Sequence, residues 1–361
     1  MNKALKRWST LTLAAGLIIT GFGYTGQATV VAAGNTKNIA VVPSVILKWK
    51  GTTLTQKGLI SNGNTLIPVT LLRDQLGLSL NYNPGTRTYS LGSGYRQLNM
   101  DVSEYGVNTN VNNFYLNEYE VKNIGGKLYI PFKLMSDYLG YEGVWNSELK
   151  SLSITPRLQN DLEITTKVLE SNTKDALFIV RYPQISGLAD AKVEKIINSK
   201  LEKLKDDFVD ASKEQATKRD SSIEHTYQFF QNYVVSYNEN DVLSIVIDQY
   251  GYTGGAHGGT LRIGMNFSLV DGELLSLADQ LKEKNADYAT ELDKHVVKGL
   301  TEINGYVEDY KGVTSESNYY LKSEGIALFF QQYEYTPYAA GIPTFVVPYQ
   351  QILPKGTSMF K

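Results

Sequence analysis

A stretch of the N-terminal half occurs twice in this sequence, and the second copy follows the first at a constant offset of 63 residues. A repeat of this kind constrains the fold strongly, because both copies are expected to form the same supersecondary unit. The equivalent positions are Pro68 and Pro131, Leu71 and Leu134, Gly77 and Gly140, Tyr82 and Trp145, Asn83 and Asn146, and Leu91 and Ile154.

Each copy predicts a short strand, a helix and a hairpin. The apolar run before Pro68 is typical of a strand, and the proline can begin a helix, where its missing N–H costs nothing. Gly77 is expected to end that helix, and the turn-rich residues after Tyr82 separate two further strands. We therefore predict a small domain over residues 38–156 that contains two β-α-β-β units.

These motifs resemble the copper amine oxidase N-terminal domain, also called the stalk domain, which is common in secreted Gram-positive proteins. The oxidase chemistry of that family is not expected here, because the sequence has no His-x-His and no Asn-Tyr pair followed by an acidic residue. The resemblance implies either adhesion near the cell wall or a spacer that holds the next domain away. Of these two roles we favour the spacer.

The first 33 residues have the layout of a secretory signal peptide. Lys3, Lys6 and Arg7 form a positive segment, residues 11–22 form an apolar run, and small residues lead up to Ala33. The apolar run is shorter than the ~20 residues that span a bilayer. An uncleaved membrane anchor is the alternative. We expect cleavage, a secreted or wall-associated protein, and no stable membrane span afterwards.

Composition excludes several classes of function. The formal net charge is −2, and residues 34–361 carry −5, because the first 33 residues contain three basic and no acidic side chains. A mildly acidic chain without a basic block is not expected to bind nucleic acid, whose phosphates dominate affinity. The absence of cysteine excludes disulfides, thiolate nucleophiles and iron–sulfur clusters. With only three histidines in the chain, we expect no metal and no cofactor.

The second half predicts an α+β domain with an antiparallel sheet and two long helices. Apolar residues recur at helical spacing over residues 190–218, and a second helix is expected over residues 286–303. Alternating segments predict strands around them, including a hairpin with the turn Asp271-Gly272. The fold class of the whole chain is therefore α+β, and we divide the second half into residues 158–260 and 261–355.

A glycine-rich segment over residues 252–259, Tyr-Thr-Gly-Gly-Ala-His-Gly-Gly, connects two of the predicted strands. It is not expected to bind phosphate, because it does not lie before a helix and does not match the phosphate-loop motif. Two roles are open for His257 in this segment. It is either a general base or ligand, or a hydrogen-bonded residue of a tight turn, and we favour the turn.

Three motifs of this half are similar to the paired extracellular domain of the RsiV-type anti-sigma factors and the PdaC-type peptidoglycan deacetylases. These motifs occupy residues 252–257, 266–281 and 329–343. In the anti-sigma factors this region is implicated as a receptor for lysozyme, so the resemblance implies lysozyme binding. We expect neither sigma-factor signalling nor deacetylation, because we find neither the sigma-binding and membrane helices nor the metal-binding deacetylase domain.

The candidate ligand-binding residues lie mainly in the last of these motifs. The chain has 25 tyrosines against 12 phenylalanines, and tyrosine suits surfaces that bind sugars or proteins. Prolines stiffen the tyrosine-rich loop, which also contains Gly341 and could present its rings to a ligand. The alternative is that these rings, Tyr333 included, pack the core of the domain. The candidate residues are Tyr335, Pro337, Tyr338, Gly341, Tyr252 and His257.

We therefore predict a secreted or wall-associated binding protein that is not an enzyme. Its C-terminal domain is expected to bind lysozyme or a similar wall-lytic enzyme. The first alternative is a module that binds peptidoglycan. The second is a wall hydrolase that uses His257 with a carboxylate such as Asp248, and we rank it last because the sequence reveals no nucleophile–base pair.

Overall fold

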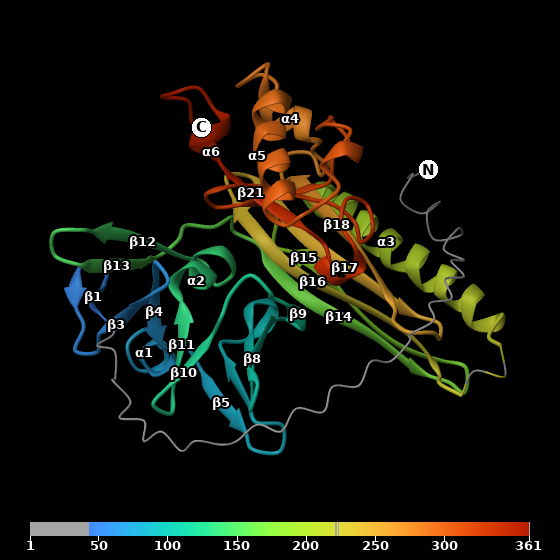
Figure 1. Ribbon diagram of the computed structural model, residues 1–361, viewed down its shortest axis with the longest axis horizontal. Coiled ribbons are helices and arrows are strands. Elements are labelled where there is room, and N and C mark those ends of the chain that lie inside the picture. Colours follow the sequence, from blue (N-terminus) through green and yellow to red (C-terminus); the bar gives the residue numbers. More distant parts are fainter. Residues whose placement is uncertain (1–42, 221, 223, 361) are drawn as a thin grey trace, which may run out of the picture. The chain divides into compact units, whose positions relative to one another are not determined.

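The computed structural model describes residues 43–220, 222 and 224–360, so the predicted signal peptide lies outside the described residues. Helices and several antiparallel sheets are mixed along the chain (Figure 1), which confirms the predicted α+β class. Within the described ranges, no helix is both long enough and apolar enough to cross a membrane.

Each copy of the repeat folds as a strand, a helix and a hairpin, as the sequence predicts. Both helices begin directly after a proline in extended conformation, and Gly77 and Gly140 beyond their ends have φ values of +77° and +79°. The first copy contains β3 (Gly58–Ser61), β4 (Asn64–Pro68), α1 (Val69–Asp74), β5 (Leu80–Asn83) and β6 (Thr88–Leu91). The second contains β10 (Lys122–Ile124), β11 (Lys127–Pro131), α2 (Phe132–Tyr138), β12 (Tyr141–Asn146) and β13 (Ser151–Pro156).

The two copies meet across a local two-fold axis. Strand β4 pairs antiparallel with β11, and Ile67 lies opposite Ile130, which is its own equivalent in the repeat. The outer pairs obey the same symmetry, because the register of β3 with β4 matches that of β10 with β11 at the 63-residue offset. An antiparallel pair in which a residue faces its own equivalent is self-complementary.

The hairpins of the two copies join different sheets. The β5–β6 hairpin continues into a five-stranded sheet of order β5-β6-β7-β8-β9. The β12–β13 hairpin pairs through β13 with β1, in parallel, in an eight-stranded sheet of order β10-β11-β4-β3-β1-β13-β12 with β2 beside β1. The elements outside the repeat are β1 (Ser44–Trp49), β2 (Thr52–Thr53), η2 (Gly94–Arg96), β7 (Leu98–Ser103), β8 (Gly106–Val111) and β9 (Phe114–Tyr115).

A five-stranded sheet of long strands forms the centre of the C-terminal half, with helix α3 along it (Figure 1). Its order is sequential, and only β15 and β16 run parallel, because α3 forms the crossover between them. The side chain of Asp190 caps α3 by accepting from the N–H of Lys192. The elements are β14 (Glu163–Asn172), β15 (Ala176–Ser186), α3 (Ala191–Thr217), β16 (Tyr227–Glu239), β17 (Val242–Tyr252) and β18 (Gly259–Ser268).

The last part of the chain forms a three-stranded antiparallel sheet and short helices. The predicted hairpin around Asp271-Gly272 is wrong in extent, because β18 ends at Ser268 and only a single bridge joins Phe267 to Leu274. Beyond Ser268, the N–H of Leu269 still donates to the backbone carbonyl of Asp241. The elements are α4 (Leu277–Leu281), α5 (Tyr288–Glu302), η3 (Val307–Asp309), β19 (Tyr319–Lys322), β20 (Gly325–Phe329), η4 (Tyr338–Ala340), β21 (Thr344–Pro348) and α6 (Tyr349–Ile352).

One hydrophobic cluster joins the repeat region to the C-terminal half. Val234 of β16 and Phe329 of β20 are buried in the same cluster as side chains of the repeat such as Ile154. Phe114 of β9 also lies under the guanidinium of Arg262 in β18, 5.2 Å from it to the ring centre. A spacer that holds the C-terminal half away does not share a core with it, so the structure differs from the favoured spacer interpretation.

A buried ion pair lies at the same junction. The Nζ of Lys322 in β19 lies 2.9 Å from Oδ2 of Asp137 in α2 and 3.2 Å from the hydroxyl of Tyr119, which donates to the same carboxylate. Both charged side chains are almost inaccessible to solvent. Burial raises the pKa of Asp137, but the attraction of Lys322 and Lys133 outweighs it, so this pKa lies below its ordinary value.

Candidate functional site

Two loops that are far apart in the sequence meet beside β18. The first is the glycine-rich segment between β17 and β18, and the second follows β20 over residues 330–343. The side chain of Gln332 accepts from the N–H of Thr260 at 2.7 Å, and that of Gln331 accepts from and donates to the backbone of Arg262 at 3.0 and 2.8 Å. The two side-chain amides pair with the backbone of the edge strand β18 as a neighbouring strand would. They thereby hold the second loop beside the first, which leads directly into β18.

Three rings from these loops form a cluster that we call the aromatic platform: His257, Tyr333 and Tyr338. The ring centres of His257 and Tyr338 are 3.7 Å apart with planes at 15°, and Tyr333 lies 5.6 Å from Tyr338. The Nδ1 of His257 is 3.0 Å from the carbonyl oxygen of Gly258, so in the neutral ring Nδ1 carries the proton. The Nε2 atom can then accept from the hydroxyl of Tyr333, 3.3 Å away.

The aromatic platform is open to solvent. Tyr333 is 54% exposed, His257 is also exposed, and Tyr338 is half-buried between its neighbours. Tyr333 has a φ of +65°, a left-handed conformation that costs a non-glycine residue of order 1 kcal/mol or more. The fold therefore holds a large aromatic side chain outward in a strained conformation.

Two further aromatic side chains support the platform from the sheet. Tyr250 of β17 stacks on Phe230 of β16, with ring centres 5.9 Å apart and planes at 14°. A Cβ atom at Gly258 would overlap the ring of Tyr250, so only glycine lets the loop lie over that ring. Burial raises the pKa of Tyr250, and the neighbouring Tyr338 acts in the same direction.

The structure does not bring the six candidate residues predicted from the sequence together in one site. It brings His257 and Tyr338 into contact. Exposed Pro337 and half-buried Gly341, which has a φ of +68°, lie at the two ends of the short helix η4. Tyr252 lies at the base of the glycine-rich segment, where its hydroxyl donates to the carbonyl of Gly255 at 3.0 Å.

The side chain of Tyr335 points into the core of the protein. It is only 8% exposed and belongs to a buried cluster, where its ring makes edge contacts with Phe330 and Tyr310 at 5.0 and 5.5 Å. This residue therefore has the core-packing role that the sequence left open. Tyr250 was missed because the predicted strand ended at that residue, whereas β17 runs on to Tyr252 and places both tyrosines on one face.

Asp248, the carboxylate considered as a partner of His257, is engaged elsewhere. Both of its oxygens accept from Arg262 at 2.8 Å in a bidentate, partly buried pair. Burial lowers the pKa of Arg262, but the attraction of Asp248 outweighs this effect and raises it. The pair holds β17 to β18 beside the repeat region, because the same guanidinium lies over Phe114.

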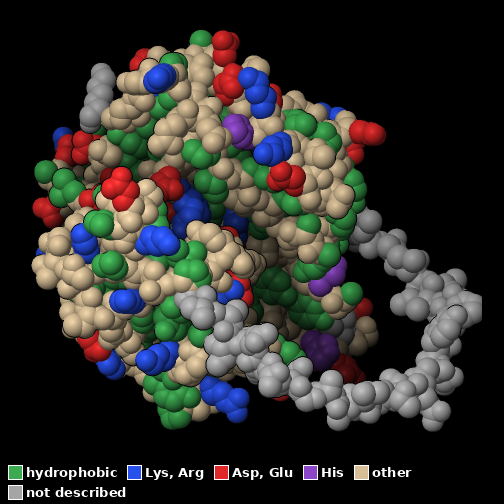
Figure 2. All heavy atoms as spheres, turned by 60° about the vertical axis from the view of Figure 1, so that its left-hand side comes forward, with side chains coloured by type: hydrophobic (Ala, Val, Ile, Leu, Met, Phe, Trp, Pro, Cys, Tyr) green, Lys and Arg blue, Asp and Glu red, His purple; other side chains and the backbone are tan. Residues whose placement is uncertain are grey.

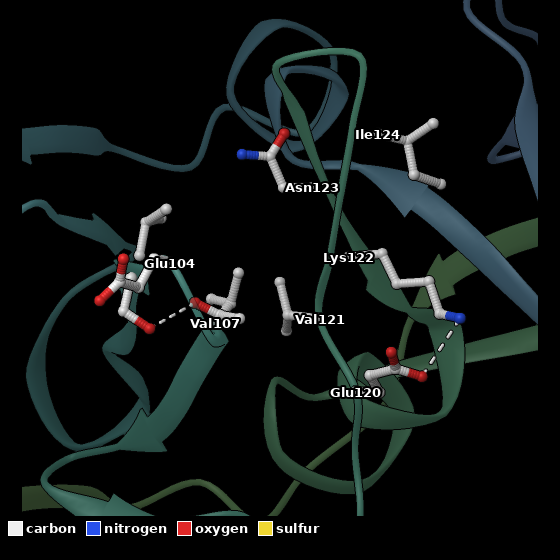
Figure 3. Close-up of a pocket in the computed structure, with 10 residues that line it drawn as sticks. Glu104, Val107, Glu120, Val121, Lys122, Asn123 and Ile124 are labelled. Atoms are coloured by element: carbon white, nitrogen blue, oxygen red, sulfur yellow. Dashed lines mark hydrogen bonds and ion pairs between the residues drawn. The ribbon is translucent and has the colours of Figure 1, made fainter. Parts of the chain in front are cut away.

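Two hollows are distinct from the three rings of the platform. One, of about 420 Å³, is formed by the β7–β8 turn and residues 120–124, where Lys122 pairs with Glu120 at 3.2 Å (Figure 3). The other, of about 520 Å³, is lined by Tyr252 among others. Among the residues that the structure describes, no group of three or more acidic, histidine or cysteine side chains is arranged to hold a metal ion. On the face shown in Figure 2, acidic and basic side chains are interspersed.

Comparisons with known families match three parts of the chain. Residues 47–168 match the copper amine oxidase N-terminal domain, residues 170–260 match "Deacetylase PdaC", and residues 277–350 match a family described as a protein of unknown function, DUF3298. The peptidoglycan-N-acetylmuramic acid deacetylase PdaC of Bacillus subtilis strain 168 is 24% identical over 203 residues. That match covers 52% of this chain and 41% of the relative, so less than half of the relative is represented here.

Two crystal structures of DUF3298 family proteins are also similar to this chain. The protein from Bacteroides fragilis NCTC 9343 is 21% identical with a TM-score of 0.44, and the match covers 54% of this chain and 94% of that one. The protein from Pseudomonas aeruginosa PAO1 is 16% identical with a TM-score of 0.41, covering 56% and 98%.

The expectation that this chain is not an enzyme is wrong on these findings. A family described as a deacetylase matches residues 170–260, and a relative named as a peptidoglycan deacetylase matches over 203 residues, so both point toward enzyme activity. The sequence argument failed because it required a nucleophile–base pair to be visible along the chain. Along the chain, the matched families follow one another in the order copper amine oxidase N-terminal domain, PdaC and DUF3298.

Proposed function

We propose that this is an exported, wall-associated protein whose C-terminal half binds the glycan of peptidoglycan through the aromatic platform. The observation that carries the proposal is the open stack of His257, Tyr333 and Tyr338, which two separate loops build together. The relative from Bacillus subtilis is named for action on a sugar of peptidoglycan, which supports a wall glycan as the ligand.

The chemistry of the platform suits a sugar. A pyranose ring offers an apolar C–H face and a rim of hydroxyls, and tyrosine offers an apolar ring with a polar edge. The platform does not have to reorganise to bind, because Gln331 and Gln332 fix the loop and Tyr338 is stacked already. Preorganisation of this kind lowers the entropic cost of binding.

The test is co-sedimentation of the full chain with purified sacculi. We expect Tyr338→Ala to weaken binding about tenfold or more, because it removes the central ring of the stack. Tyr105→Ala is the matched control, since Tyr105 is 92% exposed at the β7–β8 turn and stacks on none of the aromatic rings that the structure describes. Equal sedimentation of both variants and the unchanged chain would exclude the platform as the binding surface.

The deacetylase matches extend the same experiment to catalysis. Acetate released from the sacculi by the full chain measures deacetylation directly. Release that stops in His257→Ala but persists in Tyr105→Ala would place the reaction at the aromatic platform. Release that continues in both variants would place it elsewhere in the chain.

A second candidate ligand is lysozyme or a similar wall-lytic enzyme. The exposure of Tyr333 and Pro337 favours it, because rings on an open surface suit the flat face of a protein as well as a sugar. Calorimetric titration of the full chain with lysozyme tests this candidate. Saturable binding at low and at physiological salt that is lost in Tyr338→Ala supports it, whereas heat at low salt alone indicates nonspecific charge attraction.

A further inference from the structure

A hollow of about 520 Å³ lies on the five-stranded sheet that supports the aromatic platform. Its size falls in the range of small-molecule sites in proteins. Four of its lining residues form one row across the strands, because each faces the next in the register of β14, β15, β16 and β17. The row consists of Asn172, Leu177, Gln228 and Tyr252, and His225 and Thr226 complete the lining.

The described residues that line the hollow are mostly polar and include no acidic, lysine or arginine side chain. Among the described residues, the amide side chains of Asn172 and Gln228 make no hydrogen bond, so each offers both a donor and an acceptor to a ligand. Leu177 and the ring of Tyr252 supply apolar surface between them. A neutral ligand with amide or hydroxyl groups and an apolar face satisfies this set, whereas an ionic ligand finds no counter-charge there.

Strand β17 connects the hollow to the aromatic platform. Tyr252 lines the hollow, and Tyr250, two residues before it, lies on the same face of the strand. The ring of Tyr250 lies against Gly258, which is bonded in sequence to His257 of the platform. A ligand longer than one sugar can therefore contact both the platform and the hollow.

We propose that the hollow is a subsite for an N-acetylated sugar unit of the glycan, and this proposal rests on the proposed function. The acetamido group presents one N–H and one carbonyl, which is the complement of a free carboxamide side chain. Gln228 and Asn172 pair with that group, Leu177 lies against its methyl, and Tyr252 stacks on the sugar ring. The platform then binds a neighbouring unit of the same chain.

The experiment compares two neutral tetrasaccharides that share the β(1→4) linkage. The tetramer of N-acetylglucosamine carries acetamido groups, and cellotetraose has hydroxyls in their place. We expect the full chain to bind the first at least tenfold more tightly in calorimetric titration. Gln228→Ala and Asn172→Ala should each weaken binding of the N-acetylated tetramer about five- to tenfold, which is the loss of one or two hydrogen bonds.

The discriminating readout is the effect on cellotetraose. Its affinity should fall by no more than about twofold in Gln228→Ala or Asn172→Ala, because a single hydroxyl cannot supply both the N–H and the carbonyl of an acetamido group. Gln351→Ala in α6 is the matched control, an exposed amide outside the hollow, and should bind both sugars as the unchanged chain does. Asn172 is exposed in its strand, so its substitution is not expected to impair folding.

The outcomes separate this inference from the proposed function. Equal affinity for the two tetramers, or amide variants that bind both sugars normally while Tyr338→Ala binds neither, would overturn the subsite and leave the platform as the glycan site. No binding of either tetramer or of sacculi by the unchanged chain would remove the proposed function, and the subsite with it.

Discussion

At the scale of single residues, the site depends on backbone conformations that side chains rarely adopt. Tyr333 has a φ of +65°. Two substitutions can test the backbone strain at this position separately from the loss of the aromatic ring. We expect Tyr333→Gly to be about 1 kcal/mol more stable than Tyr333→Ala, because only alanine keeps a Cβ in the left-handed region. Both variants should lose sacculus binding. Chemical denaturation measures the difference, and equal stabilities would argue against strain at this position.

Adjacent glycines give a second residue-scale prediction. A Cβ at Gly258 would overlap the ring of Tyr250, whereas one at Gly259 meets no atom within 4 Å. Gly258→Ala should therefore displace the loop that carries His257 and weaken glycan binding about tenfold, while Gly259→Ala should bind normally. Co-sedimentation with sacculi measures both. Normal binding by Gly258→Ala would show that the loop adjusts without disturbing the platform.

At the scale of elements, the pair Lys322–Asp137 joins strand β19 to helix α2. Asp137→Asn leaves a buried lysine without its closest counter-charge, so we expect a loss of about 3 kcal/mol in the free energy of unfolding. Glu324→Gln is the control, because the Lys133–Glu324 pair is exposed and should contribute less than about 1 kcal/mol. Urea denaturation measures the free energy of unfolding of both variants. Similar losses in the two variants would contradict the expectation that the buried pair contributes more than the exposed one.

The same pair predicts a pH dependence. The folded-state pKa of Asp137 is lowered, so its stabilisation is fully present above the unfolded-state value of about 3.9 and is lost as the pH falls through the folded-state value. As the pH falls below about 4, the unchanged chain should progressively lose its stability advantage over Asp137→Asn. An advantage that stays constant through this range would show that Asp137 is not the titrating group.

At the scale of the whole molecule, one hydrophobic cluster contains residues from segments that match different families. Phe329 belongs to the C-terminal half but is fully buried in the cluster that contains the repeat. We expect calorimetry to show one unfolding transition, and Phe329→Ala to lower its midpoint as a single peak, at a cost of about 3–5 kcal/mol. Tyr105→Ala should leave the midpoint unchanged. Two peaks, of which only one shifts, would contradict a shared core.

The sequence is sufficient to predict the local elements, because proline, glycine and apolar spacing act within a few residues. The repeat and α3 follow from such signals. The meeting of His257 with Tyr338 could not be predicted, since it depends on Gln331 and Gln332 pairing with β18. The opposite orientations of Tyr333 and Tyr335 follow from a backbone conformation that no residue type signals.

The symmetric pairing of Ile67 with Ile130 has a consequence for the origin of the N-terminal domain. A chain with only one copy of the repeat would carry a strand edge complementary to itself, and two such chains would associate as a homodimer with the same central sheet. Gene duplication and fusion would then have joined the subunits of an ancestral dimer. Once joined, the copies no longer had to be identical, and their hairpins could be recruited into different sheets.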